Sequence, residues 1–543
     1  MFHSHAYKGK TELWVFLLII AVAIFFRFYQ IDVIPPGLWV DEAMNGTDAL
    51  HVVDDRDPKI FYPDNNGREG LFISIQGLSV WAFGNEAWAL RVVAGLFGVL
   101  TVAGLYILTK ELFSSWHIGA ISAFLLATSF WHVNFSRISF RAIMLPFIIV
   151  WAVYFLWKGI KKSHFSDFIA AGIFAGLGFY TYLSYRVAPL IFLAIFINYW
   201  FFIRSHYQYT EYNYARDRLL KGFIVFALVA FVVAMPIILY FYSHLGDAAM
   251  RQSQLSVFNY PNPVKELFTS IIRTLGMFNF YGDGNQRHNI SGDPMLVWPI
   301  GVFFIIGFIR ELIAWFKMPH GHPSPVHTLL FAWFFIMLLP GFLSTESPHA
   351  LRTIGVIPVV MIFAAKGIWW LLEVISDWHG LHEANYATNK ASYRHEAISI
   401  KKMVIVVLLI AVAIVEYNRY FLIWGKSEFT ELAFTKNLTD ISYYLENNSI
   451  TSPTFIVVNE PGVVVEGVSI FAQPIKFLTR THTSNAQQEK QVFYISEEQV
   501  NDLRSVAHYR MIPLLETQRV KNFINTNTRL QKTSYENFTV YSK

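Results

Sequence analysis

The 543-residue sequence contains no cysteine and few charged residues. The missing cysteine excludes disulfides, thiolate nucleophiles and zinc sites built on Cys, and it leaves the cellular compartment open. Charged residues make up 15% of the chain, against roughly 25% in an average soluble protein. The sequence also lacks a P-loop, a dinucleotide-binding glycine motif and an H-E-x-x-H zinc motif. It therefore gives no sign of these three chemistries.

Long apolar runs take the place of the missing charge. Each run has about 18–25 residues, which is the length a helix needs to cross a ~30 Å hydrocarbon core. The segment Leu71–Phe83 is shorter and is expected to lie in the membrane interface. We therefore predict an α-helical polytopic membrane protein with about eleven transmembrane helices. The predicted spans are 12–29, 87–110, 116–134, 140–158, 166–183, 187–204, 221–242, 295–315, 326–343, 350–374 and 403–424.

The distribution of Lys and Arg predicts the orientation, because cytoplasmic connections are rich in these residues. The first apolar run, Leu13–Phe26, follows Lys8 and Lys10 and lacks a small-residue cleavage site, so we expect an uncleaved first helix with its N-terminus inside. Nearly all Lys between the spans then falls in cytoplasmic connections, which also accounts for the net charge of +5 without nucleic-acid binding. The prediction is a multi-pass plasma-membrane protein with a cytoplasmic N-terminus. Its outer loops are 30–86 and 243–294.

The composition changes near residue 425. Short β-rich runs at Thr454–Asn459, Val463–Phe471 and Gln491–Ile495 alternate with polar helical stretches at Leu432–Leu445 and Glu497–Ala507. We therefore predict a transmembrane domain over 1–424, followed by a small soluble α/β domain over 425–543 on the outer face.

Arginine is unexpectedly frequent near the predicted outer helix ends, where cations are normally scarce. The planar fork of Arg suits phosphate and carboxylate. Snorkelling toward headgroups explains single members of the set, but an outward-facing site for an anion such as a lipid phosphate explains the whole set better. Arg137 and Arg141, four residues apart, share a face if one helix carries both. The set is Arg68, Arg91, Arg137, Arg141, Arg186, Arg273, Arg287 and Arg352.

An acidic pair, Asp41 and Glu42, follows Pro35-Pro36-Gly37 and opens an amphipathic segment. One interpretation is structural, because Asp is a good N-cap and Glu in a first turn suits the helix dipole. The other is catalytic. Adjacent helical residues point about 100° apart, so one acid would act as a base while the other orients it or binds a second partner.

The segment 281–295 is rich in Gly, Asn and Asp, as structured turns are. Asp283, Arg287, His288 and Asn289 are candidates to contact a polar ligand, and a loop folded on itself is the alternative. A metal site of Asp283, His288 and Asp293 has only generic ligand spacing. We expect no cofactor and no metal, with a divalent cation left open.

Taken together, three stretches resemble the GT-C superfamily of membrane glycosyltransferases, in particular the dolichyl-phosphate-mannose protein mannosyltransferase-like and aminoarabinose transferase-like group. The similarity covers about residues 12–360. The stretches are Trp39-Val40-Asp41-Glu42-Ala43; Asn66-Gly67-Arg68-Glu69-Gly70-Leu71-Phe72 with Phe83-Gly84 and Ala89-Leu90-Arg91; and Ser136-Arg137 and Arg141 with Gly282-Asp283, Arg287-His288-Asn289 and Pro294-Met295-Leu296.

This resemblance implies a sugar donor on a polyprenyl phosphate, bound from the outer leaflet, and transfer to an acceptor hydroxyl with inversion. It implies that Asp41 is the general base, and we expect Glu42 to support it or to contact the acceptor. A Trp-Trp-Asp signature is absent, which disfavours a protein N-glycosylating relative, and no Lys-Pro pair follows Arg68, which disfavours an aminoarabinose donor. The expected substrate and phosphate contacts are Arg68, Glu69, Arg137, Arg141, Asp283, Arg287, His288, Asn289 and Arg352.

Two other functions stay open. A transporter or flippase of polyprenyl-linked glycans would also use many helices and outward Arg, although transporters usually place charges near the midplane or in repeats. A non-catalytic membrane scaffold would leave the acidic pair and the Arg set unexplained. An assay with a radiolabelled lipid-linked sugar separates covalent transfer, translocation and neither.

Overall fold

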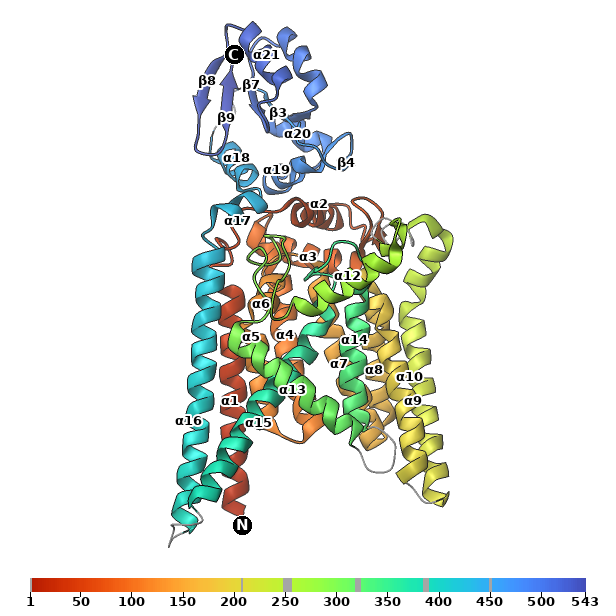
Figure 1. Cartoon of the computed structure of the whole chain (residues 1–543). Coiled ribbons are helices and arrows are strands. Elements are labelled where there is room, and N and C mark those ends of the chain that lie inside the picture. Colours follow the sequence, from red (N-terminus) through yellow and green to blue (C-terminus); the bar gives the residue numbers. More distant parts are fainter. Residues whose placement is uncertain (1, 207–208, 248–255, 318–323, 384–389, 449–451) are drawn as a thin grey trace. The chain divides into compact units, whose positions relative to one another are not determined.

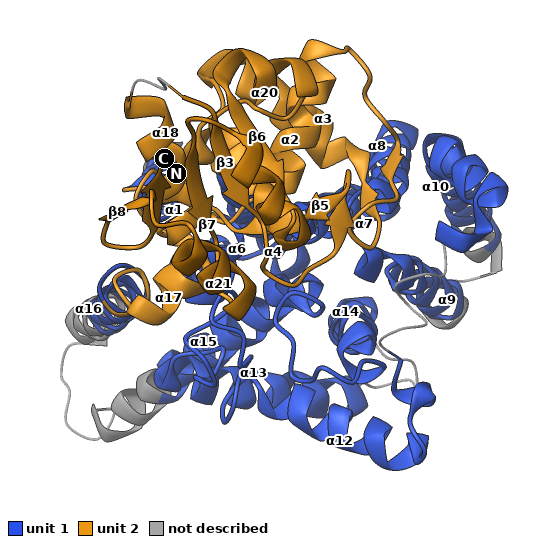
Figure 2. Cartoon of the chain, turned by 90° about the horizontal axis from the view of Figure 1, so that it is seen from above, with its two compact units in different colours: residues 1–29, 94–136, 141–422 blue, residues 30–93, 137–140, 423–543 orange. Residues whose placement is uncertain are grey.

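The computed structural model describes residues 2–206, 209–247, 256–317, 324–383, 390–448 and 452–543. The chain forms two compact units (Figure 2). Unit 1 comprises residues 1–29, 94–136 and 141–422, and unit 2 comprises residues 30–93, 137–140 and 423–543.

The regular secondary structure among the described residues of unit 1 is helical (Figure 1). Short 3₁₀ helices at Arg141–Ile143, Gly178–Tyr180, Leu183–Val187, Val257–Asn259 and Ile354–Val356 join the longer ones. Helix α4 (Ala87–Phe113) starts in unit 2, and a π-helical turn, Asn418–Trp424, leads back into it. The other helices are α1 (Phe2–Phe28), α5 (Trp116–Thr128), α6 (Phe130–Phe135), α7 (Met144–Lys162), α8 (Phe165–Leu177), α9 (Pro189–His206), α10 (Tyr209–Ser243), α12 (Pro263–Gly276), α13 (Trp298–Phe316), α14 (Pro325–Phe342), α15 (Ile357–Glu383) and α16 (Lys390–Tyr417).

Among the described residues, nine helices are long and apolar enough to cross a membrane. Two shorter apolar helices, Trp116–Thr128 and Phe165–Tyr180, coincide with the remaining predicted spans. The prediction of a polytopic α-helical membrane protein is therefore confirmed. The predicted span 116–134 is interrupted at Ser129, which separates α5 from α6.

Close helix packing in unit 1 depends on small residues. Helices α13 and α15 run against each other, and α8 packs along α10. A Cβ atom on Gly307 would lie 1.8 Å from the Phe363 carbonyl oxygen, and one on Gly367 would lie 2.0 Å from that of Phe303. Only glycine allows these two backbones to approach so closely, as is common between transmembrane helices.

Helix α12 differs from the spans because it is short and amphipathic. Val264, Phe268 and Ile272 follow one another at four-residue steps and are largely exposed. An exposed apolar face on a 14-residue helix fits a position in the membrane interface.

Unit 2 begins with the first loop of the chain. Helix α2 (Val40–Asp54) is followed by the hairpin β1 (Phe61–Tyr62) and β2 (Arg68–Glu69) and by α3 (Gly70–Phe83). The structure thus has a helix where the sequence predicted the short interfacial segment. Leu78 and Trp81 of α3 are largely exposed.

The C-terminal part of unit 2 is built on a mixed sheet of order β6-β3-β7-β9-β8. Strand β3 pairs in parallel with β6 and β7, and β9 pairs antiparallel with β7 and β8. A small hairpin, β4 (Val464–Val465) and β5 (Val468–Ser469), stands apart. The sheet strands are β3 (Thr454–Val457), β6 (Val492–Ile495), β7 (Arg510–Pro513), β8 (Gln531–Ser534) and β9 (Thr539–Ser542), with helices α17 (Glu428–Ala433), α18 (Lys436–Asn447), α19 (Gln473–Leu478), α20 (Ser484–Lys490) and α21 (Gln518–Thr526) and 3₁₀ helices Ile470–Ala472 and Glu497–Ser505.

The predicted C-terminal α/β domain is confirmed, with two differences in detail. The predicted helix Leu432–Leu445 is divided at Thr435, which adopts a left-handed conformation (φ 49°) that a regular helix does not tolerate. The predicted helix Glu497–Ala507 is a 3₁₀ helix, and its capping box begins at Ser496.

The first loop and the C-terminal part share one hydrophobic core. Val40 and Met44 of α2 pack among Leu438 of α18, Ile475 of α19 and Ile456 of β3. Polar contacts add to this, since Thr47 donates to Gln473 at 2.8 Å and Thr435 donates to the Leu38 carbonyl at 2.9 Å. Residues of the C-terminal part of the chain therefore fix the position of helix α2 within unit 2.

Candidate functional site

The acidic pair lies in the first turn of α2, directly after Trp39. The free N–H groups at a helix start favour negative charge, which stabilises both carboxylates there. As adjacent residues, Asp41 and Glu42 point in different directions and have different surroundings.

Glu42 is completely buried and held from three sides. Its carboxylate accepts hydrogen bonds from the backbone N–H groups of Ser139, at 2.7 Å, and Trp39, at 3.3 Å. It also forms an ion pair with Arg91, whose Nε lies 3.4 Å away and is equally buried. A carboxylate with these partners has little freedom to approach a substrate.

Asp41 is half-buried, and both of its oxygens are held in place. Asn65 Nδ2 donates to Oδ1 at 2.6 Å, and the indole N–H of Trp39 donates to Oδ2 at 3.1 Å. Two donors fix the plane of the carboxylate while part of it stays accessible. Such a group can accept a proton from a hydroxyl that approaches the remaining lone pairs.

Arg68 pairs inside unit 2 with a third acid. Its Nη1 lies 2.6 Å from Asp48 Oδ2 and donates to Asn45 Oδ1 at 2.9 Å. Burial raises the pKa of Asp48, and the charge of Arg68 partly offsets this. The neighbouring Glu69 is buried at the end of β2.

Arg137 and Arg91 hold the segment that leads into α2. Arg137 Nη2 donates to the carbonyls of Gln30, at 3.0 Å, and Ile34, at 2.7 Å. Arg91 donates to those of Pro35 and Gly37. The condition under which Arg137 and Arg141 would share a helix face is not met, because α6 ends at Phe135 and the next helix begins at Arg141.

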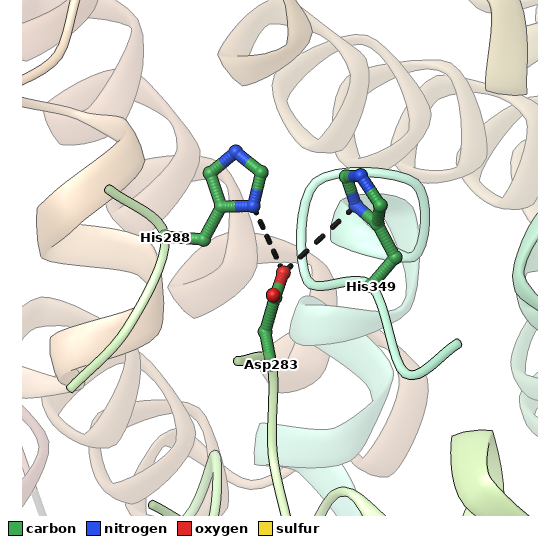
Figure 3. Close-up of side chains that lie close together, drawn as sticks. All are labelled: Asp283, His288 and His349. Carbon is green, nitrogen blue, oxygen red and sulfur yellow. Dashed lines mark hydrogen bonds and ion pairs between the residues drawn. The ribbon is translucent and has the colours of Figure 1, made fainter. Parts of the chain in front are cut away.

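In unit 1, the loop between α12 and α13 brings Asp283 and His288 together with His349, as Figure 3 shows. His288 Nδ1 lies 2.9 Å from Asp283 Oδ2, and His349 Nδ1 lies 3.9 Å from the same oxygen. The backbone N–H of Ala350 donates to this oxygen at 2.8 Å. Burial would raise the pKa of Asp283, but the hydrogen bond and charge of His288 and the charge of His349 outweigh it and lower that pKa to about 2.

The same three side chains fit a divalent cation. Their ligand atoms all lie within 4.8 Å of one another, and two imidazole nitrogens with one carboxylate oxygen are a donor set that Zn²⁺ accepts. The sequence had combined Asp283 and His288 with Asp293, but Asp293 Oδ2 lies 3.4 Å from Arg419 instead. His349 was missed because it lies 61 residues beyond His288, and spacing carries no signal over that distance.

The remaining predicted residues of this loop have structural contacts. Asn289 donates to the carbonyl of Asp293 at 2.6 Å and closes the turn. The carbonyl of Arg287 accepts from Asn134 of α6 at 2.7 Å. Their predicted roles toward a substrate stay predictions.

A cavity of about 350 Å³ in unit 1 contains two members of the Arg set, Arg186 and Arg352. Ser184, Ser256 and Ser344 add hydroxyl groups to its lining. Arg141 lies over the ring of Tyr182, a further lining residue, at 5.6 Å from the ring centroid. Arg352 also forms an ion pair with Glu346.

An apolar groove of about 490 Å³ is lined by α8, α9 and α10. One of its lining residues is the chain neighbour of a residue that lines the cavity. Tyr185 lines the groove and the adjacent Arg186 lines the cavity. Phenylalanines dominate its walls, so it suits a hydrocarbon chain. They are Phe179, Phe192, Phe196, Phe223, Phe226 and Phe231.

Comparison with known proteins agrees with this architecture. Residues 71–240 match the family described as dolichyl-phosphate-mannose-protein mannosyltransferase. The protein YkcB of Bacillus subtilis (strain 168), named as a candidate mannosyltransferase, is 27% identical over 205 residues. That match covers 35% of this chain and 28% of YkcB.

Two solved structures are similar over nearly the whole chain. ArnT from Cupriavidus metallidurans, bound to undecaprenyl phosphate, is 14% identical with a TM-score of 0.53, covering 97% of this chain and 98% of ArnT. The oligosaccharyltransferase AglB from Archaeoglobus fulgidus, in complex with an inhibitory peptide and a dolichol-phosphate, is 13% identical with a TM-score of 0.51, covering 93% and 70%.

The chain thus shares its fold with ArnT and AglB, and its residues 71–240 match the mannosyltransferase family model. The predicted resemblance to the GT-C glycosyltransferases is confirmed for the fold and for the matched segment 71–240. The prediction of a multi-pass integral membrane protein is confirmed as well.

Proposed function

We propose that this protein is a GT-C glycosyltransferase, which transfers a sugar from a polyprenyl-phosphate donor to an acceptor hydroxyl on the outer face of the membrane, with inversion. The observation that carries the proposal is the carboxylate of Asp41, which is half-buried and fixed by Asn65 and Trp39. A base that must meet an incoming hydroxyl needs this combination of fixed direction and access.

The proposed reaction needs one base and one stabilised leaving group. Asp41 takes the proton of the acceptor hydroxyl while the oxygen of that hydroxyl attacks the anomeric carbon of the sugar. The bond from that carbon to the phosphate oxygen breaks, and the polyprenyl phosphate leaves with the bonding electron pair. Since phosphate leaves without protonation, no second acid is needed, unlike in the two-carboxylate glycosidases.

Unit 1 by itself contains a candidate site for the donor. The Arg186 and Arg352 guanidinium groups suit the phosphate, and stabilisation of developing charge by fixed donors is usually the largest contribution to such catalysis. The Phe-rich groove suits the isoprenoid tail. Arg141 supports the cavity through Tyr182.

The remaining residues of the predicted site receive supporting roles. Glu42, with Arg91 and Ser139 as partners, fixes the start of α2 beside the base. Arg68 and Arg137 order the surrounding loop. A divalent cation held by Asp283, His288 and His349 would supply positive charge for a substrate phosphate.

The proposed outer-face location rests on the Lys-rich connections, which favour a cytoplasmic N-terminus and an outer C-terminus. Reporter enzymes fused after residue 543 test this. A periplasmic-type reporter should be active and a cytoplasmic one inactive, and the reverse result contradicts the orientation.

Asp41→Asn tests the proposed base. The variant should bind donor normally but lose at least ~10²-fold in turnover, about 2.7 kcal/mol, because a neutral amide accepts no proton. Asn caps a helix almost as well as Asp, so a purely structural role predicts near-normal turnover. Exposed Asp57→Asn in the same loop is the matched control.

Glu42→Gln separates support from catalysis. It leaves the buried Arg91 without its anionic partner, which typically costs about 3–5 kcal/mol of stability. We therefore expect a lower unfolding temperature, with turnover reduced less per folded molecule than in Asp41→Asn.

A radiolabelled lipid-linked sugar tests the transporter alternative. Label that crosses the membrane without covalent transfer contradicts the enzyme proposal.

A further inference from the structure

A second polar cavity, of about 400 Å³, lies at the opposite end of α9 from Arg186. It is lined where α7 ends, α8 begins, α9 ends and α10 begins. Helix α10 contacts both α8 and α9, and Figure 1 shows α9 and α10 next to each other. None of its lining residues belongs to the proposed donor site.

The polar part of this cavity is cationic. Lys161 and Arg218 line it together with Ser163, Tyr199 and Tyr214, and no Asp or Glu is among the lining residues. Arg218 donates to the Tyr214 hydroxyl and to the Ser163 carbonyl, each at 3.1 Å. Among the residues that the structure describes, Arg218 has no carboxylate partner.

Lys161 forms only a weak ion pair. It lies 3.3 Å from Glu111 in an ion pair whose side chains are both partly exposed. Exposed pairs of this kind contribute little to stability, so an incoming anion can compete for the ammonium group. The cavity therefore presents two cations to a negatively charged ligand.

The rest of the lining is apolar. Phe165, Phe168, Phe202, Ile203 and Leu219 face the same cavity. A soluble anion such as a free sugar phosphate would gain nothing from these walls, whereas an amphiphile would use both parts. The residues lie at the ends of the candidate spans Arg141–Lys162, Leu183–Ile203 and Asn213–Ser243, which is the depth of lipid headgroups.

We propose that this cavity binds an anionic phospholipid, with its phosphodiester between Lys161 and Arg218 and the upper part of its acyl chains against the aromatic wall. Basic pockets between transmembrane helices recognise acidic headgroups in this way. The site is separate from the proposed transfer reaction, so it stands or falls independently of Asp41.

Binding to the full-length protein in detergent tests the proposal, with native mass spectrometry as the readout. Phosphatidylglycerol should be retained in preference to phosphatidylcholine of the same chain length. Arg218→Gln should lower the phosphatidylglycerol affinity about fivefold or more and Arg218→Lys less, because one cation near a lipid headgroup is worth about 1 kcal/mol. Lys162→Gln, an exposed cation next to Lys161 that does not line the cavity, is the matched control.

Three outcomes overturn the proposal. They are equal retention of the two phospholipids, an affinity unchanged in folded Arg218→Gln, and displacement of the lipid by inorganic phosphate or glycerol phosphate alone. A preference for undecaprenyl phosphate over phosphatidylglycerol at this cavity would also contradict it, because the ligand would then be the donor lipid. Size-exclusion profiles and unchanged donor binding show that each variant is folded.

Discussion

Asn65 Nδ2 donates a hydrogen bond of 2.6 Å to Asp41 Oδ1, while the Trp39 indole N–H donates to Oδ2. Asn65 has a left-handed backbone (φ 52°), and so does the following exposed Asn66 (φ 65°). Both residues therefore have a similarly strained backbone. Of the two, Asn65 is the one that contacts the proposed base.

Asn65→Gly should lower turnover on the order of 10-fold without weakening donor binding, because a misplaced catalytic group costs up to ~10²-fold. Glycine accepts the left-handed conformation, so the loop keeps its shape. Asn66→Gly is the matched control and should be nearly silent. Equal losses in the two variants would mean that loop flexibility, and not the hydrogen bond to Asp41, causes the effect.

Arg352→Gln and Arg186→Gln should each weaken binding of undecaprenyl phosphate by about 10- to 100-fold, since hydrogen bonds to charged groups contribute ~1.5–3 kcal/mol. Arg273→Gln removes another Arg of the same predicted set. It lies exposed on α12 and does not line the cavity, so this variant should bind normally. Equilibrium binding of labelled lipid is the measurement, and uniform effects of all three substitutions would point to non-specific charge.

The full-length protein should bind Zn²⁺ stoichiometrically through the side chains drawn in Figure 3. His349→Gln should lower the affinity at least ~10-fold, because even losses outside the ligand set cost 10- to 100-fold. Exposed His244→Gln serves as the control. Metal content after dialysis and calorimetric titration give the answer. If His349→Gln and Asp283→Asn both keep the metal content of the unsubstituted protein, the cation is removed from the proposal.

Unit 2 should lose stability as the pH falls below 6.5. Burial, followed by the charge of His51, lowers the pKa of His482 from its ordinary value of 6.5, while Asp54 opposes the shift and Arg480 adds to it. The folded state then prefers neutral imidazole, the unfolded state binds the extra proton, and protonation favours unfolding.

The difference in unfolding temperature between about pH 7.5 and about pH 5.5 measures this effect. It should shrink in His482→Gln, which has no titrating group at this position. His508→Gln, an exposed histidine of the same unit, should behave like the unsubstituted protein. An unchanged pH response in His482→Gln would show that other groups cause it.

Apolar length made the helices predictable, since each run of about 20 such residues has few alternatives to a membrane span. Interruptions were not predictable in the same way. Ser129 divides one predicted span and Thr435 one predicted helix, because both breaks follow from local backbone conformations that hydropathy does not report.

The sequence allowed the types of functional side chain to be predicted, but not the residues that each of them contacts. The sequence singled out Asp41 and Glu42 as a pair, yet one is half-buried and the other is enclosed by Arg91 and Ser139. Likewise, Arg137 has the right chemistry for phosphate, but its guanidinium donates to two backbone carbonyls. The tertiary fold determines which distant residues become contact partners. The neighbouring residues in the sequence do not show which partners these are.

The sequence by itself determined that this is a polytopic membrane protein with an outlying α/β part and an acidic pair in its first loop, because composition and short-range pattern encode these features. Only the tertiary structure joined α2 to the C-terminal core through Val40 and Met44, and only it placed His349 beside Asp283. The physical reason is the same in both cases. Packing and ligand geometry depend on distances between residues far apart in the chain, and a linear pattern carries no information about those distances.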